Sequence, residues 1–158
     1  MEHYIIQEMS ASDHDQVCSI FRGGMASGDL VLDADDPAEW MDLERGENLV
    51  AKLDDKVVGW VIVTPLEEAE LPQGVARVGV FVDPEYRGKG IGRLLLNSAI
   101  QYSGEQGISS LICGVVPANL PAVMLHKSCG FKALGMLREA GKCRGSKRDA
   151  VLLQHTYA

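Results

Sequence analysis

The sequence has no long apolar run, and that absence argues against a protein with membrane-spanning helices. No stretch of the 158 residues approaches the roughly 18 consecutive apolar residues that a membrane-spanning helix needs. The first residues, MEHYIIQEMSASDHDQ, also lack the basic start and apolar segment that are typical of a signal peptide. We therefore expect a cytoplasmic protein with no membrane partner.

Positive charge and paired cysteines are also scarce. The chain has 15 Lys and Arg against 22 Asp and Glu, a net charge of −7, which disfavours general binding to nucleic acids or anionic membranes. The cysteines form no CxxC pair and have no histidine at metal-ligand spacing (Cys18, Cys113, Cys129 and Cys143). We therefore expect reduced thiols, no metal and no nucleic-acid partner.

Alternating strand and helix patterns fill the chain, with no linker, low-complexity stretch or internal repeat. With 46% hydrophobic residues, 158 residues are enough for one domain with its own core, residues 1–158. Period-two patterns predict strands at 4–9, two in a hairpin at 48–65, and at 75–82, 109–116, 131–139 and 150–157. Helical spacing and caps predict helices at 12–21, capped by Ser12 or Asp13, and at 35–46, 90–106 and 120–129. This order predicts an α/β fold with a mixed sheet of about seven strands and about four helices, antiparallel at first and parallel around the central helix.

A glycine-rich turn, RGKGIG, joins the strand that ends at Val82 to the central helix. Glycines let a ligand approach the backbone, and the first N–H groups of a helix have no partner within it. Arg87, Lys89 and the helix dipole add positive potential, so the turn is suited to a pyrophosphate. It lacks the GxxxxGK[ST] pattern of a Walker loop, and an ordinary glycine-capped turn remains the alternative.

The stretch VGVFVDPEYRGKGIGRLLL resembles the acyl-CoA signature of the GNAT superfamily of N-acetyltransferases, and NLPAVMLHKSCGF resembles its second signature. Within the superfamily, the sequence LHKSCGF, followed by Gly135, GKCRGSKRD and LLQ, is similar to the phosphinothricin and methionine-sulfoximine acetyltransferase group. The resemblance implies the GNAT acyl-CoA N-acyltransferase fold and acetyl-CoA as co-substrate. It also implies a small-molecule amine as acceptor and a homodimer, which we place at the C-terminal strands.

The resemblance also implies where acetyl-CoA binds. The pantetheine arm would pair like an added strand with Val80, Phe81 and Val82, in a gap beside the parallel strand at 109–116. Asn119, and with it Ser128 on the same helix, would contact that arm, although Asn119 also fits a helix cap. The pyrophosphate would lie on the loop residues Arg87, Gly88, Lys89, Gly90, Ile91 and Gly92. For Lys89, a solvated side chain is the open alternative.

Two further positions bear on the chemistry. His126 stands where many superfamily members have a tyrosine and the phosphinothricin-like group has a histidine. It would move a proton to the leaving thiolate or from the amine, unless it is a packed helix residue. Arg77 stands where that group has a glutamate proposed as the base. Arg77 would instead bind a carboxylate of the acceptor, or be a surface or salt-bridged cation.

The tail departs from the group as well. GKCRGSKRD keeps Gly141, Gly145 and Asp149 but lacks the aromatic residues between them, which argues against phosphinothricin itself as the acceptor. The sequence therefore predicts an N-acetyltransferase for an amino acid or a related metabolite. Two alternatives remain: a catalytically weak acyl-CoA-binding regulator, suggested by the missing glutamate, and an acetyltransferase of protein N-termini.

Overall fold

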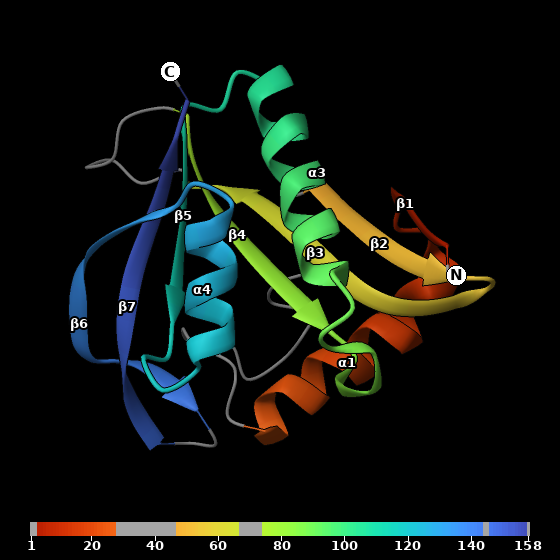
Figure 1. Ribbon diagram of the computed structural model, residues 1–158, viewed down its shortest axis with the longest axis horizontal. Coiled ribbons are helices and arrows are strands. Elements are labelled where there is room, and N and C mark those ends of the chain that lie inside the picture. The colour runs from red at the N-terminus through yellow and green to blue at the C-terminus, as the bar shows by residue number, and fades with distance from the viewer. Residues whose placement is uncertain (1–2, 28–46, 67–73, 144–145, 158) are drawn as a thin grey trace.

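A computed structural model shows a seven-stranded mixed sheet in the order β1-β2-β3-β4-β5-β7-β6 (Figure 1). It describes residues 3–27, 47–66, 74–143 and 146–157. The strands are β1 (Tyr4–Glu8), β2 (Glu47–Leu53), β3 (Lys56–Pro65), β4 (Val75–Val82), β5 (Ser110–Val115), β6 (Lys132–Cys143) and β7 (Ser146–Thr156). The described helices are α1 (His14–Ser27), α3 (Ile91–Glu105) and α4 (Leu120–Ser128), with 3-10 turns at Ala11–Asp13 and Pro84–Tyr86.

The predicted fold class is confirmed, a mixed sheet that is antiparallel at first and parallel around the central helix. All strand pairs are antiparallel except β4 with β5, which flank α3 in sequence and run parallel. The helix expected at 35–46 lies outside the described residues. β6 and β7 extend further toward their connection than the predicted strands, because pairing resumes beyond a register shift between Leu137 and Gly141. Glu139 has a φ of 52° in this bulge, and its N–H donates to Asp149 Oδ1 at 2.9 Å.

Helices cover both faces of the sheet, and each face has its own apolar core. α3 and α4 lie over one face, where Leu95, Leu96 and Phe131 belong to a buried cluster with the inner strands (Figure 1). α1 lies over the other face, where Phe21 packs with Trp60. The sheet is therefore the middle of three layers.

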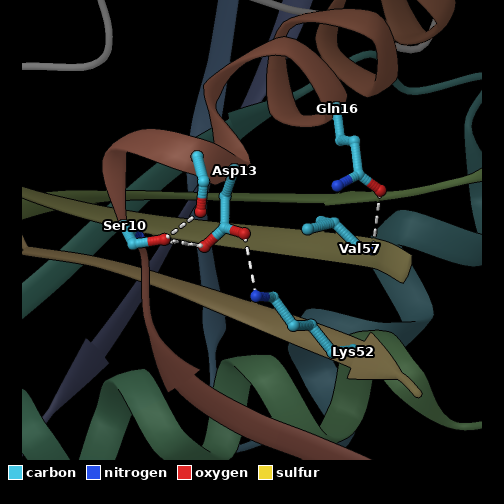
Figure 2. Close-up of polar contacts among 6 residues, drawn as sticks. Ser10, Asp13, Gln16, Lys52 and Val57 are labelled. Atoms are coloured by element: carbon cyan, nitrogen blue, oxygen red, sulfur yellow. Dashed lines mark hydrogen bonds and ion pairs between the residues drawn. The ribbon is translucent and has the colours of Figure 1, made fainter. Parts of the chain in front are cut away.

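α1 is fixed to the sheet at its first turn by a small polar cluster (Figure 2). We expected the helix cap at Ser12 or Asp13, but the chain turns earlier, at Ser10. The carboxylate of Asp13 accepts hydrogen bonds from the Ser10 N–H at 2.9 Å and hydroxyl at 3.1 Å, which satisfies an N-terminal donor. It also pairs with Lys52 of β2 at 2.8 Å, so the helix start is tied to the sheet.

Gly59 lets α3 lie close to the sheet. A Cβ at Gly59 would lie 2.8 Å from Leu95 Cδ1 and 3.0 Å from Ile91 Cγ2, so these side chains of α3 would have to shift. Gly59 pairs with Val82, the last residue of β4. The missing side chain therefore places the first turn of α3 next to the end of β4, where the glycine loop begins.

Candidate active site

The site starts where the parallel strands β4 and β5 separate. Their pairing is limited to Val75–Ser110, Ala76–Leu111 and Arg77–Ile112, and beyond these residues the two strands diverge (Figure 1). The rest of β4, from Val78 to Val82, therefore has β3 on one side and no strand pairing with β5 on the other.

Hydrogen bonds at both ends of β4 show which backbone groups point into this gap. Asp83 N donates to Val58 O at 2.9 Å, and Val75 O accepts from Leu66 N at 2.9 Å, so odd-numbered residues face β3. Because the direction alternates along an antiparallel strand, the N–H and C=O groups of Val80 and Val82 point away from β3 toward the gap. The backbone of Phe81 faces β3 instead.

A cavity of about 570 Å³ occupies the gap and continues along the glycine loop and α4. β4, the loop and the start of α3 contribute Val78, Gly79, Val80, Phe81, Val82, Tyr86, Arg87, Gly88, Gly90, Ile91, Gly92 and Arg93. The other lining residues are Ile20 of α1, Cys113, Gly114 and Val115 of β5, and Asn119, Pro121, Ala122, Leu125 and His126 of the α4 segment. Among these described residues no carboxylate lines the cavity, and Arg87 and Arg93 are its charged side chains.

The glycine loop has the conformation that its glycines were expected to allow. Gly88 and Gly90 have φ of 77° and 82°, the left-handed region that other residues rarely adopt. A Cβ at either position would meet no atom within 4 Å, so the backbone is open to a ligand there. Gly90 is the N-cap of α3, whose first N–H groups and dipole favour an anion at this end of the cavity.

α4 begins with a cap that leaves part of Asn119 available. Asn119 Oδ1 accepts from Ala122 N at 3.3 Å, which is the predicted capping bond. Asn119 also lines the cavity, and the cap does not use its amide N–H₂ donors. Gly92 allows α4 to approach α3, because a Cβ there would lie 3.0 Å from Leu125 Cδ2.

His126 lies in the cavity wall and is only 5% exposed. Its Nδ1 is 2.7 Å from the carbonyl oxygen of Ala122, and since a carbonyl only accepts, Nδ1 carries the proton. Nε2 is buried and has no hydrogen-bond partner among the described residues. Burial lowers the pKa of His126, and the bond to Ala122 offsets this only in part. The ring is therefore neutral at neutral pH, with a free lone pair on Nε2.

Arg77 lies beside the cavity and does not line it. It shares the α1 face of β4 with Gly79 and Phe81, which do line the cavity, and it pairs across to Thr64. The side chain is half-buried, and burial lowers the pKa of its guanidinium.

Two of the predicted binding residues point elsewhere. Lys89 Nζ lies over the Tyr86 ring, 5.5 Å from its centroid, and the Ser128 hydroxyl donates to Leu125 O at 2.7 Å. Neither lines the cavity. Sequence reasoning missed Arg93, although a cation in the first turn after a glycine loop is a usable signal. It also missed Ile20, which no local pattern marks because the fold brings α1 to the site.

Within the described part of the chain, no group of three or more His, Cys, Asp or Glu could hold a metal ion. No described helix is both long and apolar enough to cross a bilayer.

Comparisons with known proteins agree with this architecture. Phosphinothricin N-acetyltransferase of Streptomyces viridochromogenes is 26% identical over 159 residues, 96% of this chain and 87% of that protein. L-amino acid N-acyltransferase MnaT of Escherichia coli is 26% identical over 129 residues, 80% of this chain and 75% of its own. Human N-acetyltransferase 8 is 35% identical over 94 residues, and the match spans 58% of this chain and only 41% of the human protein.

A solved structure shares the fold over nearly the whole chain. The phosphinothricin acetyltransferase of Sinorhizobium meliloti, in complex with AcCoA, superposes with a TM-score of 0.83 at 22% identity, over 98% of this chain and 89% of that one. The sequence profile of the Acetyltransferase (GNAT) family matches residues 14–131, from the start of α1 to Phe131, just before β6. The chain belongs to the GNAT family of acetyltransferases.

Proposed function

We propose that this acetyltransferase moves an acetyl group from acetyl-CoA to the amine of a small amino acid or amino-acid-like metabolite. The main observation behind the proposal is that one cavity is lined by three features. These are an open β4 edge, a glycine loop at a helix N-terminus, and a buried neutral histidine. The names of the relatives, which act on phosphinothricin and on L-amino acids, support the acceptor class.

The residues of the cavity fit acetyl-CoA, which supplies an activated acetyl group as a thioester. The N–H and C=O groups of Val80 and Val82 would bind the amides of the pantetheine arm as a neighbouring strand would, and the Asn119 amide would donate to the same arm. The loop from Arg87 to Gly92 would bind the pyrophosphate, with Arg93 as a further cation.

The transfer needs a neutral amine, because the nitrogen attacks the thioester carbonyl and forms the C–N bond as the C–S bond breaks. His126 Nε2 is the base that the described cavity offers, since no described carboxylate lines it. The imidazole would take the proton from the amine and return it to the departing thiolate, while the bond to Ala122 O keeps the tautomer fixed. A backbone N–H of β4 that points into the gap would stabilise the oxyanion.

The acceptor would approach from the α1 face of the sheet. Ile20 and Phe81 line the cavity there, and Arg77 lies two residues from Gly79 on the same face. A guanidinium at this position would pair with the carboxylate of an α-amino acid through two parallel hydrogen bonds. Arg77 is therefore proposed as the acceptor-binding residue.

A homodimer through the C-terminal strands is part of the proposal. β6 is an edge strand whose residues from Lys132 to Glu139 are exposed, including Leu134 at 58% and Met136 at 49%. Apolar side chains and unpaired backbone groups on an edge favour pairing with a second copy. Light scattering at micromolar concentration should give twice the 17.1 kDa chain mass, and a monomer would contradict the dimer.

A regulatory acyl-CoA-binding domain is the second candidate, because the described cavity has no carboxylate base. A thiol-release assay separates the two functions. Acetyl-CoA is incubated with the protein and a panel of amino acids, sulfoximine analogues, alkylamines and peptides. Release that depends on the added amine supports the transferase. Tight acetyl-CoA binding without amine-dependent release across the panel supports the regulator.

A further inference from the structure

Phe131 follows the turn at Gly130 that ends α4, and its ring is buried against the imidazole of His126. It is 3% exposed, and the two ring centroids are 5.2 Å apart with the planes at 89°. Aromatic rings prefer this edge-to-face arrangement, which contributes about 0.5–1.5 kcal/mol beyond the buried area. The imidazole therefore has two contacts that restrain it: the carbonyl of Ala122 and the ring of Phe131.

A single hydrogen bond does not fix the plane of a histidine ring. The second side-chain torsion of histidine has a broad energy minimum, so a ring bonded only through Nδ1 can tilt about that bond. Tilting would move Nε2, the atom with the free lone pair, relative to a substrate in the cavity. A second contact against the ring is what limits this motion, and Phe131 provides it.

Phe131 also contacts the first of two further rings. Its centroid is 5.5 Å from that of His155, and the ring of His155 packs edge-to-face on Tyr157 at 4.9 Å. The Tyr157 hydroxyl donates to the carbonyl of Ile100 in α3 at 2.7 Å. The rings therefore form a row that runs from the cavity wall, past the end of β7, to the body of α3.

The turn at Gly130 brings Phe131 back to His126. Gly130 has a φ of 93°, and Phe131 N donates to the backbone carbonyl of His126 at 3.0 Å. A Cβ at Gly130 would lie 3.2 Å from Nδ1 of His155, so a side chain there would press on the row. Gly130 and Phe131, which end the second family signature, therefore place the Phe131 ring against His126.

We infer that Phe131 is a positioning residue for acetyl transfer, which limits the tilt of the His126 imidazole and so fixes the place of Nε2 in the cavity wall. The inference rests on the proposed role of His126 in the reaction. Phe131 does not itself line the cavity, so its effect passes through the histidine.

The test replaces the ring while keeping an apolar side chain, as Phe131→Leu. We expect kcat to fall about tenfold, because small misplacements of a reacting group are costly, while KM for acetyl-CoA changes less than about twofold. NMR of the His126 ring should show the Nδ1–H tautomer in both proteins, because the bond to Ala122 O is kept, whereas nuclear Overhauser effects from the ring protons should show one ring orientation in the native protein and more than one in the variant. Val17→Ala is the control, because it removes buried volume from the core beneath α1, away from His126.

Unchanged kcat and an unchanged ring orientation in Phe131→Leu would overturn the inference, as would an equal loss of kcat in Val17→Ala. If Phe131→Leu does not fold, His155→Leu tests the next ring in the row and should give the same NMR change with a loss of about threefold. Failure of the proposed function gives a different result: His126→Ala would keep its kcat, while the NMR spectrum would still report whether Phe131 orients the ring.

Discussion

The ammonium group of Lys52 lies 2.8 Å from a carboxylate oxygen of Asp13, whose side chain is 3% exposed (Figure 2). Burial acts to raise the pKa of Asp13. The hydrogen bonds from Lys52 and Ser10 and the charge of Lys52 outweigh it, so the pKa is lowered. The ion pair therefore stabilises the contact between α1 and β2 as long as the carboxylate is ionised.

Asp13→Asn should lower the free energy of unfolding by about 1–3 kcal/mol at neutral pH, because charge-assisted hydrogen bonds are lost. The pKa of Asp13 is lower in the folded protein than its unfolded value of about 3.9, so this stability is complete above that pH and is lost as the pH falls through the folded pKa. Urea titrations from pH 2 to 7 measure it. The exposed Asp15→Asn is the control, and a constant difference between the native protein and Asp13→Asn down to pH 2 would contradict the assignment.

Gly90→Val should abolish acetyl-CoA binding, because the new side chain would occupy the open space above the loop where the pyrophosphate is proposed to lie. A φ of 82° also strains any residue with a Cβ, so the backbone cost must be separated from the loss of the site. Gly107→Val provides that control, since Gly107 has a φ of 80° just beyond the other end of α3 and is equally open. Thermal shifts with CoA should disappear in the first variant and persist in the second. A retained shift in Gly90→Val would place the pyrophosphate elsewhere.

His126→Ala should lower kcat at neutral pH by about 10² or more, with KM for acetyl-CoA nearly unchanged. His126→Asn is an informative second variant, because its amide can still donate to Ala122 O but offers no base.

Burial lowers the pKa of His126, so the acidic limb of the native kcat profile should lie below about pH 6.5. The stability from the neutral ring is likewise complete above about pH 6.5 and declines below it. Normal kcat in a destabilised His126→Ala would make His126 a packing residue.

Much of this site is readable from the sequence because its parts are local. The glycines of the loop and the Asn119 cap follow from residue type and spacing, whereas the gap between the parallel strands was implied by the family resemblance; the structure has all three. The tautomer of His126 was not predictable, because it depends on a contact one helical turn away. The cap at Ser10 was missed since its geometry depends on a carboxylate three residues later. The contribution of Ile20 depends on long-range packing that no local pattern encodes.

Arg77 leads to the sharpest expectation about the acceptor. A lysine-type amine, with a pKa of about 10.4, is free base in only about one molecule in 2,500 at neutral pH, whereas a peptide-terminal amino group with a pKa near 8 is about one-tenth free. Free α-amino acids titrate higher than peptide termini, so a cation beside their amine would help. A nearby cation disfavours the ammonium form further and binds a carboxylate, so α-amino acids should outperform alkylamines of matched size.

Arg77→Ala should raise the KM for α-amino acids most. Arg77→Lys should restore part of the charge effect but not the paired hydrogen bonds. The exposed Arg22→Ala on α1 controls for loss of one positive charge. The measurement is steady-state kinetics with α-amino acids and alkylamines of matched size. Equal rates with the two kinds of acceptor, or an unaltered preference in Arg77→Ala, would show that Arg77 is a structural cation of β4 and does not bind the acceptor.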